Sequence, residues 1–180
     1  MQPPSRVIAT LVLSLITVIL AGCAGYHVGP SKPAYMSDVR NIAIPSFKNL
    51  TLEPRMEVIF ANTLAKQIQQ DGTYKITNED ESDVILQGTV VRIDRTPARG
   101  LRTDFFQTTE FNLILTLEIK LTDRRNGKIL ATRSITGNTT FFVSSANPRT
   151  SDVNKDERQA IPLAAEDAAV KVVTFLADGW

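Results

Sequence analysis

The clearest hydrophobic pattern in the chain is an alternation between residues 110 and 122. Every second position there is apolar, and apart from Ile114 the positions between are polar. The apolar positions are Phe111, Leu113, Leu115, Leu117, Ile119 and Leu121. A period of two predicts a β-strand with one face against a core and the other largely solvated. Asn126-Gly127 follows and is typical of a hairpin turn, so residues 128–142 are expected to return antiparallel.

Two other segments have the period of a helix. In the first, Met56, Phe60, Leu64 and Ile68 are each four residues apart, and Asp71-Gly72 is expected to end the helix. Glu53 and Pro54 suit its first turn. The second helix follows a polar loop, and Pro162 is expected in its first turn. Its apolar side is rich in alanine, which allows a close approach to a sheet: Ala165, Ala168, Ala169, Val172, Val173 and Leu176.

Two further strands complete the predicted fold, over residues 39–47 and 82–94. Pro45 has no amide hydrogen to donate, so the first strand is expected to lie at an edge or to end there. Residues 97–107 are expected to form a loop or an irregular hairpin connection. The order strand, helix, three strands, helix (β-α-β-β-β-α) predicts an α+β two-layer sandwich. Its roughly four-stranded, mainly antiparallel sheet would carry both helices on one face.

Composition excludes several classes of function. The net charge is +1, whereas general nucleic-acid binding requires a strong basic excess. The chain has one cysteine, Cys23, and one histidine, His27, which excludes an intramolecular disulfide, a cysteine-based zinc site and a metal site made by a pair of histidines. The densest acidic group, Glu79 to Glu81, is interpreted as a solvated loop. We therefore expect no metal, no cofactor and no enzymatic activity.

The position of Cys23 indicates a lipid anchor. Arg6 precedes an apolar run that ends in Leu20-Ala21-Gly22-Cys23, the arrangement of a bacterial lipobox. The thiol would accept a diacylglyceryl group, and the new N-terminus an acyl chain such as palmitate. We expect a cleaved signal peptide at residues 1–22, a tether at 23–38 and one domain at 39–180. The alternatives are an uncleaved signal anchor, or an ordinary signal peptide with an incidental cysteine.

The same residues resemble a known family. The lipobox followed by "GYHV", then "RNIAIPSFKN", "DVILQGTVVRI", "TTEFNLILTLEIKLTD" with "GKIL", and an alanine-rich last helix are similar to LptE. That family comprises the lipopolysaccharide-assembly lipoproteins of Gram-negative bacteria. The resemblance implies a small α/β sandwich that plugs the β-barrel protein LptD, helps it to assemble and binds lipopolysaccharide. Ala24, in place of aspartate, favours sorting to the periplasmic face of the outer membrane.

Two basic and aromatic segments are candidates for the ligand site, because lipopolysaccharide presents phosphates and acyl chains. The candidate phosphate ligands are Arg99, Arg102, Arg149 and Lys155. The resemblance places Lys155 at the family's second basic position, whereas a gapless match puts Asp104 at the first. All of these charges can equally be solvated loop charges.

Aromatic pairs mark the same two segments. One ring each of Phe105-Phe106 and Phe141-Phe142 is expected in the core, because adjacent residues of a strand point to opposite faces. Phe106 and Phe142 are then candidates for contact with the barrel wall. A lipoprotein that activates or scaffolds a periplasmic cell-envelope enzyme is the alternative function. Lipoproteins of that second class typically have a long tether, whereas only 15 residues separate Cys23 from Val39 in this chain.

Overall fold

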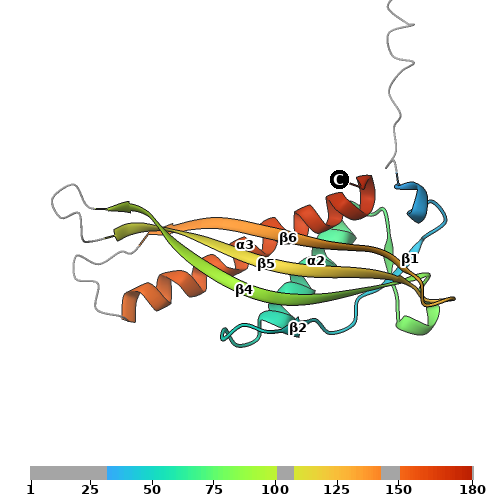
Figure 1. The fold of residues 1–180 in the computed structure, drawn as a ribbon, viewed down its shortest axis with the longest axis horizontal. Helices are drawn as coiled ribbons and strands as arrows, with labels where there is room; N and C mark the ends of the chain where they lie inside the picture. Colours follow the sequence, from blue (N-terminus) through green and yellow to red (C-terminus); the bar gives the residue numbers. More distant parts are fainter. Residues whose placement is uncertain (1–31, 101–107, 143–150, 180) are drawn as a thin grey trace, which may run out of the picture. The chain divides into compact units, whose positions relative to one another are not determined.

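The computed structural model describes residues 32–100, 108–142 and 151–179, with residues 99–100, 108–109 and 151–155 described as backbone. The chain divides into two units, Met1–Pro30 and Ser31–Trp180, and every described residue belongs to the second (Figure 1). The predicted signal peptide, Cys23 and most of the predicted tether therefore lie outside the described residues.

One mixed sheet organises the second unit. Its strands are β1 (Asn41–Ala43), β2 (Lys48–Asn49), β3 (Lys75–Ile76), β4 (Val84–Gly100), β5 (Thr108–Asp123) and β6 (Ile129–Phe142). The order is β3-β1-β4-β5-β6, and β2 also pairs with β4. β4, β5 and β6 form the predicted antiparallel meander. The remaining pairs are parallel: β1 with β3, β1 with β4, and β2 with β4. The α+β class with two helices is confirmed. The predicted sheet of about four strands is wrong, because the sheet has six. The sequence carries no signal for β2 and β3, which have two residues each, too few to show a period.

The first strand does not lie at an edge. β1 is hydrogen-bonded to β3 on one side and to β4 on the other. It ends at Ala43, before Pro45, so the proline removes no hydrogen bond from the ladder. Parallel strands need a crossover connection, and the helix α2 supplies it between β1 and β3.

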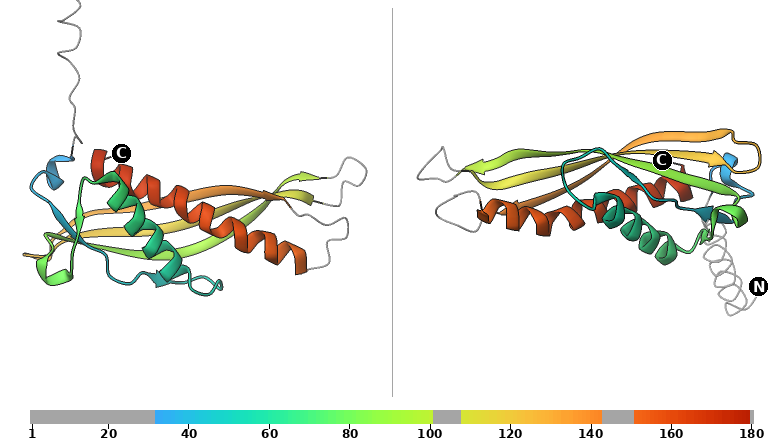
Figure 2. Two further views of the ribbon diagram at one scale, coloured as in Figure 1. Left: turned by 180° about the vertical axis from the view of Figure 1, so that it is seen from behind. Right: turned by 90° about the horizontal axis from the view of Figure 1, so that it is seen from below.

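The two faces of the sheet differ as the alternation in β5 predicts. Leu113, Leu117 and Leu121 have no exposed surface, whereas Glu118 and Lys120 between them are exposed. Both helices cover the apolar face (Figure 2), and the opposite face of the meander carries mainly threonine, asparagine and charged side chains. The core therefore lies between one sheet face and two helices.

The helix α2 (Met56–Asp71) confirms its predicted stripe. Met56, Phe60, Leu64 and Ile68 are all at most 1% exposed. Its C-terminus is also as predicted, because Gly72 follows Asp71 in a left-handed conformation. Glu53 and Pro54, in contrast, precede the helix, and Arg55 occupies the N-cap position.

The helix α3 (Ser151–Asp178) is longer than expected and contains Pro162 in its interior, so the prediction of Pro162 in the first turn is wrong. Pro162 is exposed, whereas Ile161 and Ala164 beside it are buried. The proline costs the helix one internal hydrogen bond, but packing of the buried stripe supplies most of the stability of such a helix. Neither α2 nor α3, among the described helices, has the length and apolarity to cross a bilayer.

The alanines of α3 allow the close approach to the sheet that the sequence predicts. The partner position is Gly137 of β6. A Cβ atom added there would lie 2.0 Å from the carbonyl oxygen of Ala164 and 2.7 Å from the Cβ of Ala168. Glycine is required at this position because the helix backbone occupies the space of a side chain.

Candidate functional site

The strands that flank the two predicted ligand segments end at the same end of the sheet. Gly100 pairs with Thr108 where β4 ends and β5 begins, and Glu110 near the start of β5 pairs with Phe142 at the end of β6. Arg99 belongs to β4 and Lys155 to the first turns of α3, both as backbone. The described residues that flank the two predicted segments, at the ends of β4, β5 and β6, therefore lie at one end of the sheet. Arg102, Phe106 and Arg149 lie outside the described residues, as do Asp104 and Phe105.

The aromatic residues at this end divide between the two faces of the sheet. Phe141 is 6% exposed, and its ring stacks on that of Phe111 with centroids 5.4 Å apart. Phe142 points to the other face and is 63% exposed. The prediction that one ring of this pair is core is confirmed. The exposed Phe142, next to the stacked rings of Phe141 and the partly buried Phe111, gives this end an apolar component.

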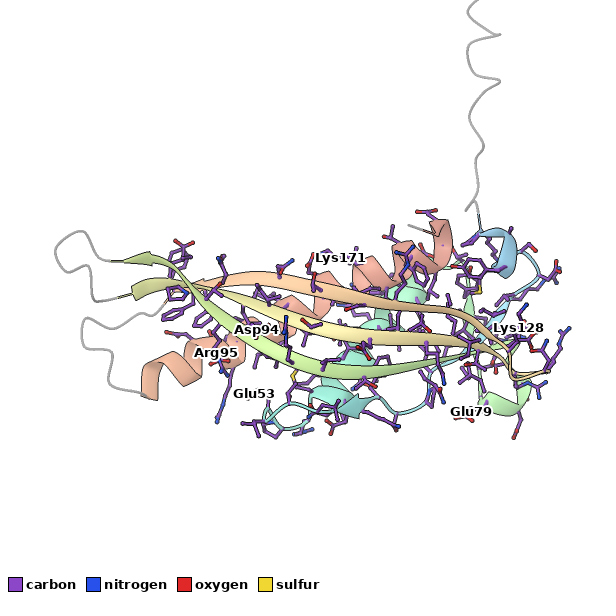
Figure 3. All side chains as sticks on the ribbon, in the orientation of Figure 1. Glu53, Glu79, Asp94, Arg95, Lys128 and Lys171 are labelled. Atoms are coloured by element: carbon purple, nitrogen blue, oxygen red, sulfur yellow. The ribbon has the colours of Figure 1, made fainter. Side chains whose placement is uncertain are left out.

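An ion network that the sequence did not predict fixes α3 close to this end. Arg95 of β4 donates from Nε to Oε1 of Glu157 in α3, and its Nη2 lies 3.0 Å from Oε1 of Glu53 (Figure 3). Glu157 is only 4% exposed, so its carboxylate depends on the guanidinium for compensation. A signal for Glu157 was present, because it lies on the same helical stripe as Ile161, Ala164 and Ala168.

A second cluster closes part of the free edge of β6. Lys171 of α3 donates to the carbonyl oxygen of Thr136 at 2.8 Å, and Oδ2 of Asp167 accepts from the amide of Asn138 at 2.8 Å. The two side chains also pair with each other at 2.7 Å. Burial raises the pKa of Asp167, but the hydrogen bonds from Lys171 and Asn138 lower it by more than burial raises it. The pKa therefore lies below its usual value. α3 thus supplies partners to backbone groups that an edge strand would otherwise expose.

The opposite end of the sheet holds the point where the chain enters the domain. The 3-10 helix η1 (Ala34–Met36) buries Met36 completely. The ammonium of Lys32 lies 4.7 Å from the ring centroid of Tyr74 and donates to the carbonyl oxygen of Val39. Burial is the main reason that the pKa of Tyr74 rises to about 12. Its hydroxyl donates to the carbonyl oxygen of Leu176 at 2.7 Å.

Asp83 joins three elements at this same end. Its Oδ2 accepts from the amides of Arg40 and Asn41, each at 3.0 Å, and its Oδ1 pairs with Arg125 at 3.2 Å. The amides of Asn41 and Arg40 are the main reason that its pKa lies below the usual value. The entry of the chain and the candidate ligand segments are separated by the length of β4. Its 17 residues, from Val84 to Gly100, span roughly 50 Å at about 3.3 Å per residue.

Within the described part of the chain, no three histidine, cysteine or acidic side chains are grouped so that they could hold a metal ion. Glu79–Glu81 form the 3-10 helix η2 and are exposed, in agreement with a solvated turn. The described residues at the candidate end supply cations, carboxylates and aromatic rings.

The model of the LptE family, described as lipopolysaccharide-assembly, matches residues 39–176. The chain belongs to the LptE family. This is a family of non-catalytic lipoproteins, and it places the chain in lipopolysaccharide assembly.

Solved structures show the same fold at low sequence identity. Rare lipoprotein B from Shewanella oneidensis has a TM-score of 0.52 at 13% identity, covering 76% of this chain and 95% of that one. PelC from Paraburkholderia phytofirmans, a dodecamer, also has a TM-score of 0.52, at 17% identity, covering 82% and 95%. A minor lipoprotein from Acinetobacter baumannii has a TM-score of 0.50 at 15% identity, covering 78% and 94%. No protein of curated function matches the sequence.

Proposed function

We propose that this LptE-family chain is an outer-membrane lipoprotein, acylated at Cys23 and held on the periplasmic face. In this proposal it plugs the LptD barrel, helps it to assemble and binds lipopolysaccharide on its way to the cell surface, without catalysing a reaction. The observation that carries the proposal is the family match over residues 39–176, which spans all six strands, α2 and α3 up to its last turn.

The position of the strand ends that flank both basic segments, at one end of the sheet, supports a lipopolysaccharide site there. Phosphates attract arginine and lysine, and the acyl chains require an apolar surface beside them. Arg95 is not assigned to the ligand, because Glu157 and Glu53 already pair with it. Four other basic residues are the proposed phosphate ligands: Arg99, Arg102, Arg149 and Lys155.

The polarity of the domain supports the same arrangement. The chain enters the domain beside Tyr74 and Met36, whereas the proposed ligand segments lie at the far end of β4. A domain anchored near one end of its sheet can present the other end deep inside a barrel while its lipid remains in the bilayer. Phe106 and Phe142 are the proposed contacts with the barrel wall.

The partner is tested by affinity purification of a tagged, full-length chain from detergent-solubilised outer membranes. We expect a large β-barrel protein to be retained. A periplasmic enzyme retained in its place would favour the role of an activator, and retention of neither would refute the proposal. Mass spectrometry of the mature N-terminus tests the lipid at Cys23, because an unmodified thiol would contradict the anchor.

Charge reversal tests the ligand site. Lys155→Glu is expected to weaken lipopolysaccharide binding and to reduce its sensitivity to salt, because a contact to phosphate would be lost. Lys128→Glu is the matched control. Lys128 is an exposed lysine at the hairpin between β5 and β6, at the other end of the sheet. Equal loss of binding in both variants would show a general effect of charge, and no loss in either would remove Lys155 from the site.

A further inference from the structure

The segment between β2 and α2 exposes two leucines to solvent. Leu50 is 69% exposed and Leu52 is fully exposed, at 103% of its reference surface. Val58, in the first turn of α2, is 43% exposed. We call Leu50 and Leu52, with the backbone that carries them, the leucine loop. Neither side chain contributes to the core of the domain.

Hydrogen bonds hold the leucine loop in one conformation. Oδ1 of Asn49 accepts from the amide of Thr51 at 3.0 Å and from its hydroxyl at 2.7 Å. Nδ2 of the Asn49 side chain donates to the carbonyl oxygen of Glu53 at 2.8 Å. The hydroxyl of Thr51 accepts from the amide of Glu53 at 3.2 Å. Each leucine is therefore flanked by side chains whose bonds fix the turn.

Two further contacts fix the loop on the sheet. The amide of Leu50 donates to the carbonyl oxygen of Val90 at 2.9 Å, and Glu53 pairs with Arg95 at 3.0 Å. Figure 3 shows Glu53 below β4, on the side where Arg95 lies. At the other end of the loop Arg55 has a φ of 65°, which is uncommon for a residue other than glycine. Strain of this kind persists where the surrounding structure over-determines it.

A single exposed leucine is ordinary on a protein surface. The leucine loop differs because its two leucines, one residue apart, project from a loop that is held by hydrogen bonds and an ion pair of Asn49, Leu50, Thr51 and Glu53. Fixing apolar anchors before binding reduces the entropy cost of association. Such anchors at the centre of a contact carry much of its affinity.

The charges around the loop select the kind of partner. Lys48 and Arg55 are balanced by Glu53 and Glu57, so the rim has no net charge. A neutral rim gives no attraction to the phosphates of lipopolysaccharide or of anionic lipids, which require a basic excess. It suits a neutral apolar pocket in a protein.

We propose that the leucine loop inserts Leu50 and Leu52 into an apolar pocket of the β-barrel partner. The proposal rests on the proposed function, which supplies that partner. It assigns an interface to a part of the domain distinct from the candidate ligand segments, because Leu50 is bonded to Val90, in the middle of β4.

The test compares tagged, full-length chains carrying Leu52→Asp or the matched control Leu163→Asp. Leu163 is a leucine of α3 that is 54% exposed. Both variants should accumulate and melt like the unmodified chain, because neither side chain is buried. We expect Leu52→Asp to reduce the retained barrel protein about tenfold, the loss typical of an interface anchor, and Leu163→Asp to leave it unchanged. Leu52→Ser is a second variant in case the aspartate lowers accumulation.

A photo-crosslinking residue in place of Leu52 identifies the contact directly. A covalent adduct with the barrel protein supports the proposal. If the barrel protein is retained equally by all variants, or if the adducts form only with lipid, the proposal is wrong while the proposed function stands. If the unmodified chain retains no barrel protein, the proposed function fails and the proposal fails with it.

Discussion

Replacing Gly137 with alanine is expected to destabilise the domain, because this position sets the distance between α3 and the sheet. The new Cβ would lie 2.0 Å from the carbonyl oxygen of Ala164 and 2.9 Å from the amide nitrogen of Ala168. Both atoms belong to the helix backbone, so no rotation of a side chain relieves the contact. α3 would have to move away by about 1 Å or more along a stripe of fully buried residues.

The magnitude follows from two opposing effects. Overpacking of a close-packed core costs about 1–3 kcal/mol, and alanine in place of glycine recovers about 0.4–1 kcal/mol by restricting the unfolded chain. Because backbone rather than side-chain atoms are in contact, we place the cost at the upper end and expect a net loss of about 2 kcal/mol. For a domain of this size that corresponds to a fall in Tm of roughly 4–8 °C.

Urea denaturation followed by circular dichroism measures this change, with an unchanged m-value as evidence that both states are otherwise preserved. Ser134→Ala is the control in the same strand, because Ser134 is exposed. Adding Ala168→Gly to Gly137→Ala removes the 2.7 Å contact but leaves the carbonyl oxygen of Ala164. We therefore expect this second change to give no full recovery. A free energy of unfolding for Gly137→Ala within about 0.5 kcal/mol of the unmodified chain, the range of an ordinary surface change, would refute the inferred packing.

Three further predictions concern the charged groups. Arg95→Met should cost about 1–3 kcal/mol of folding free energy by leaving the buried Glu157 carboxylate without its cation. Adding Glu157→Met should recover much of that loss in a double-mutant cycle. The lowered pKa of Asp83 contributes stability that is complete above about pH 4, its value in unfolded chains, and is lost as pH falls through the lowered folded pKa. Asp83→Asn should therefore flatten the acid side of a stability–pH curve measured by urea titration. Asp167→Ala should promote concentration-dependent association in sedimentation experiments, by freeing the edge amide of Asn138.

Local patterns predicted that the larger elements exist, because each has enough residues to show its period, but not all of their limits. β4 runs to Gly100, although residues 97–100 were expected to belong to a loop. The four-residue spacing from Met56 to Ile68 placed the core face of α2, and Asn126-Gly127 placed the hairpin, where Gly127 has the positive φ of 69° that the turn requires. Short parallel strands such as β3 lack this signal, since their pairing depends on residues far away in the sequence. Pro162 misled the prediction of α3 because packing outweighed the loss of one hydrogen bond.

The ion network escaped sequence reasoning because of one irregularity in β4. Leu86 and Val90 face the helices in register with Leu121 and Leu117 of β5, but the register shifts between Val90 and Arg92. Beyond this bulge the inward positions change from even to odd numbers, and Arg95 pairs with Leu113 on the helix side. Strict alternation from Val84 would have placed Arg95 in solvent.

The bulge also affects the candidate site. By turning Arg95 toward α3 it creates the partner for Glu157, two residues after Lys155, and so fixes the start of the helix that carries a proposed phosphate ligand. The same guanidinium holds Glu53 at the base of the leucine loop. One inserted residue in a strand thereby connects the ligand end to the proposed barrel contact, although the two surfaces lie in separate parts of the sequence. If that connection is physical, Arg95→Met should weaken both lipopolysaccharide binding and barrel retention. Lys155→Glu should affect only lipopolysaccharide binding, and Leu52→Asp only barrel retention. An Arg95→Met variant that weakens only one of the two, or neither, would contradict the connection.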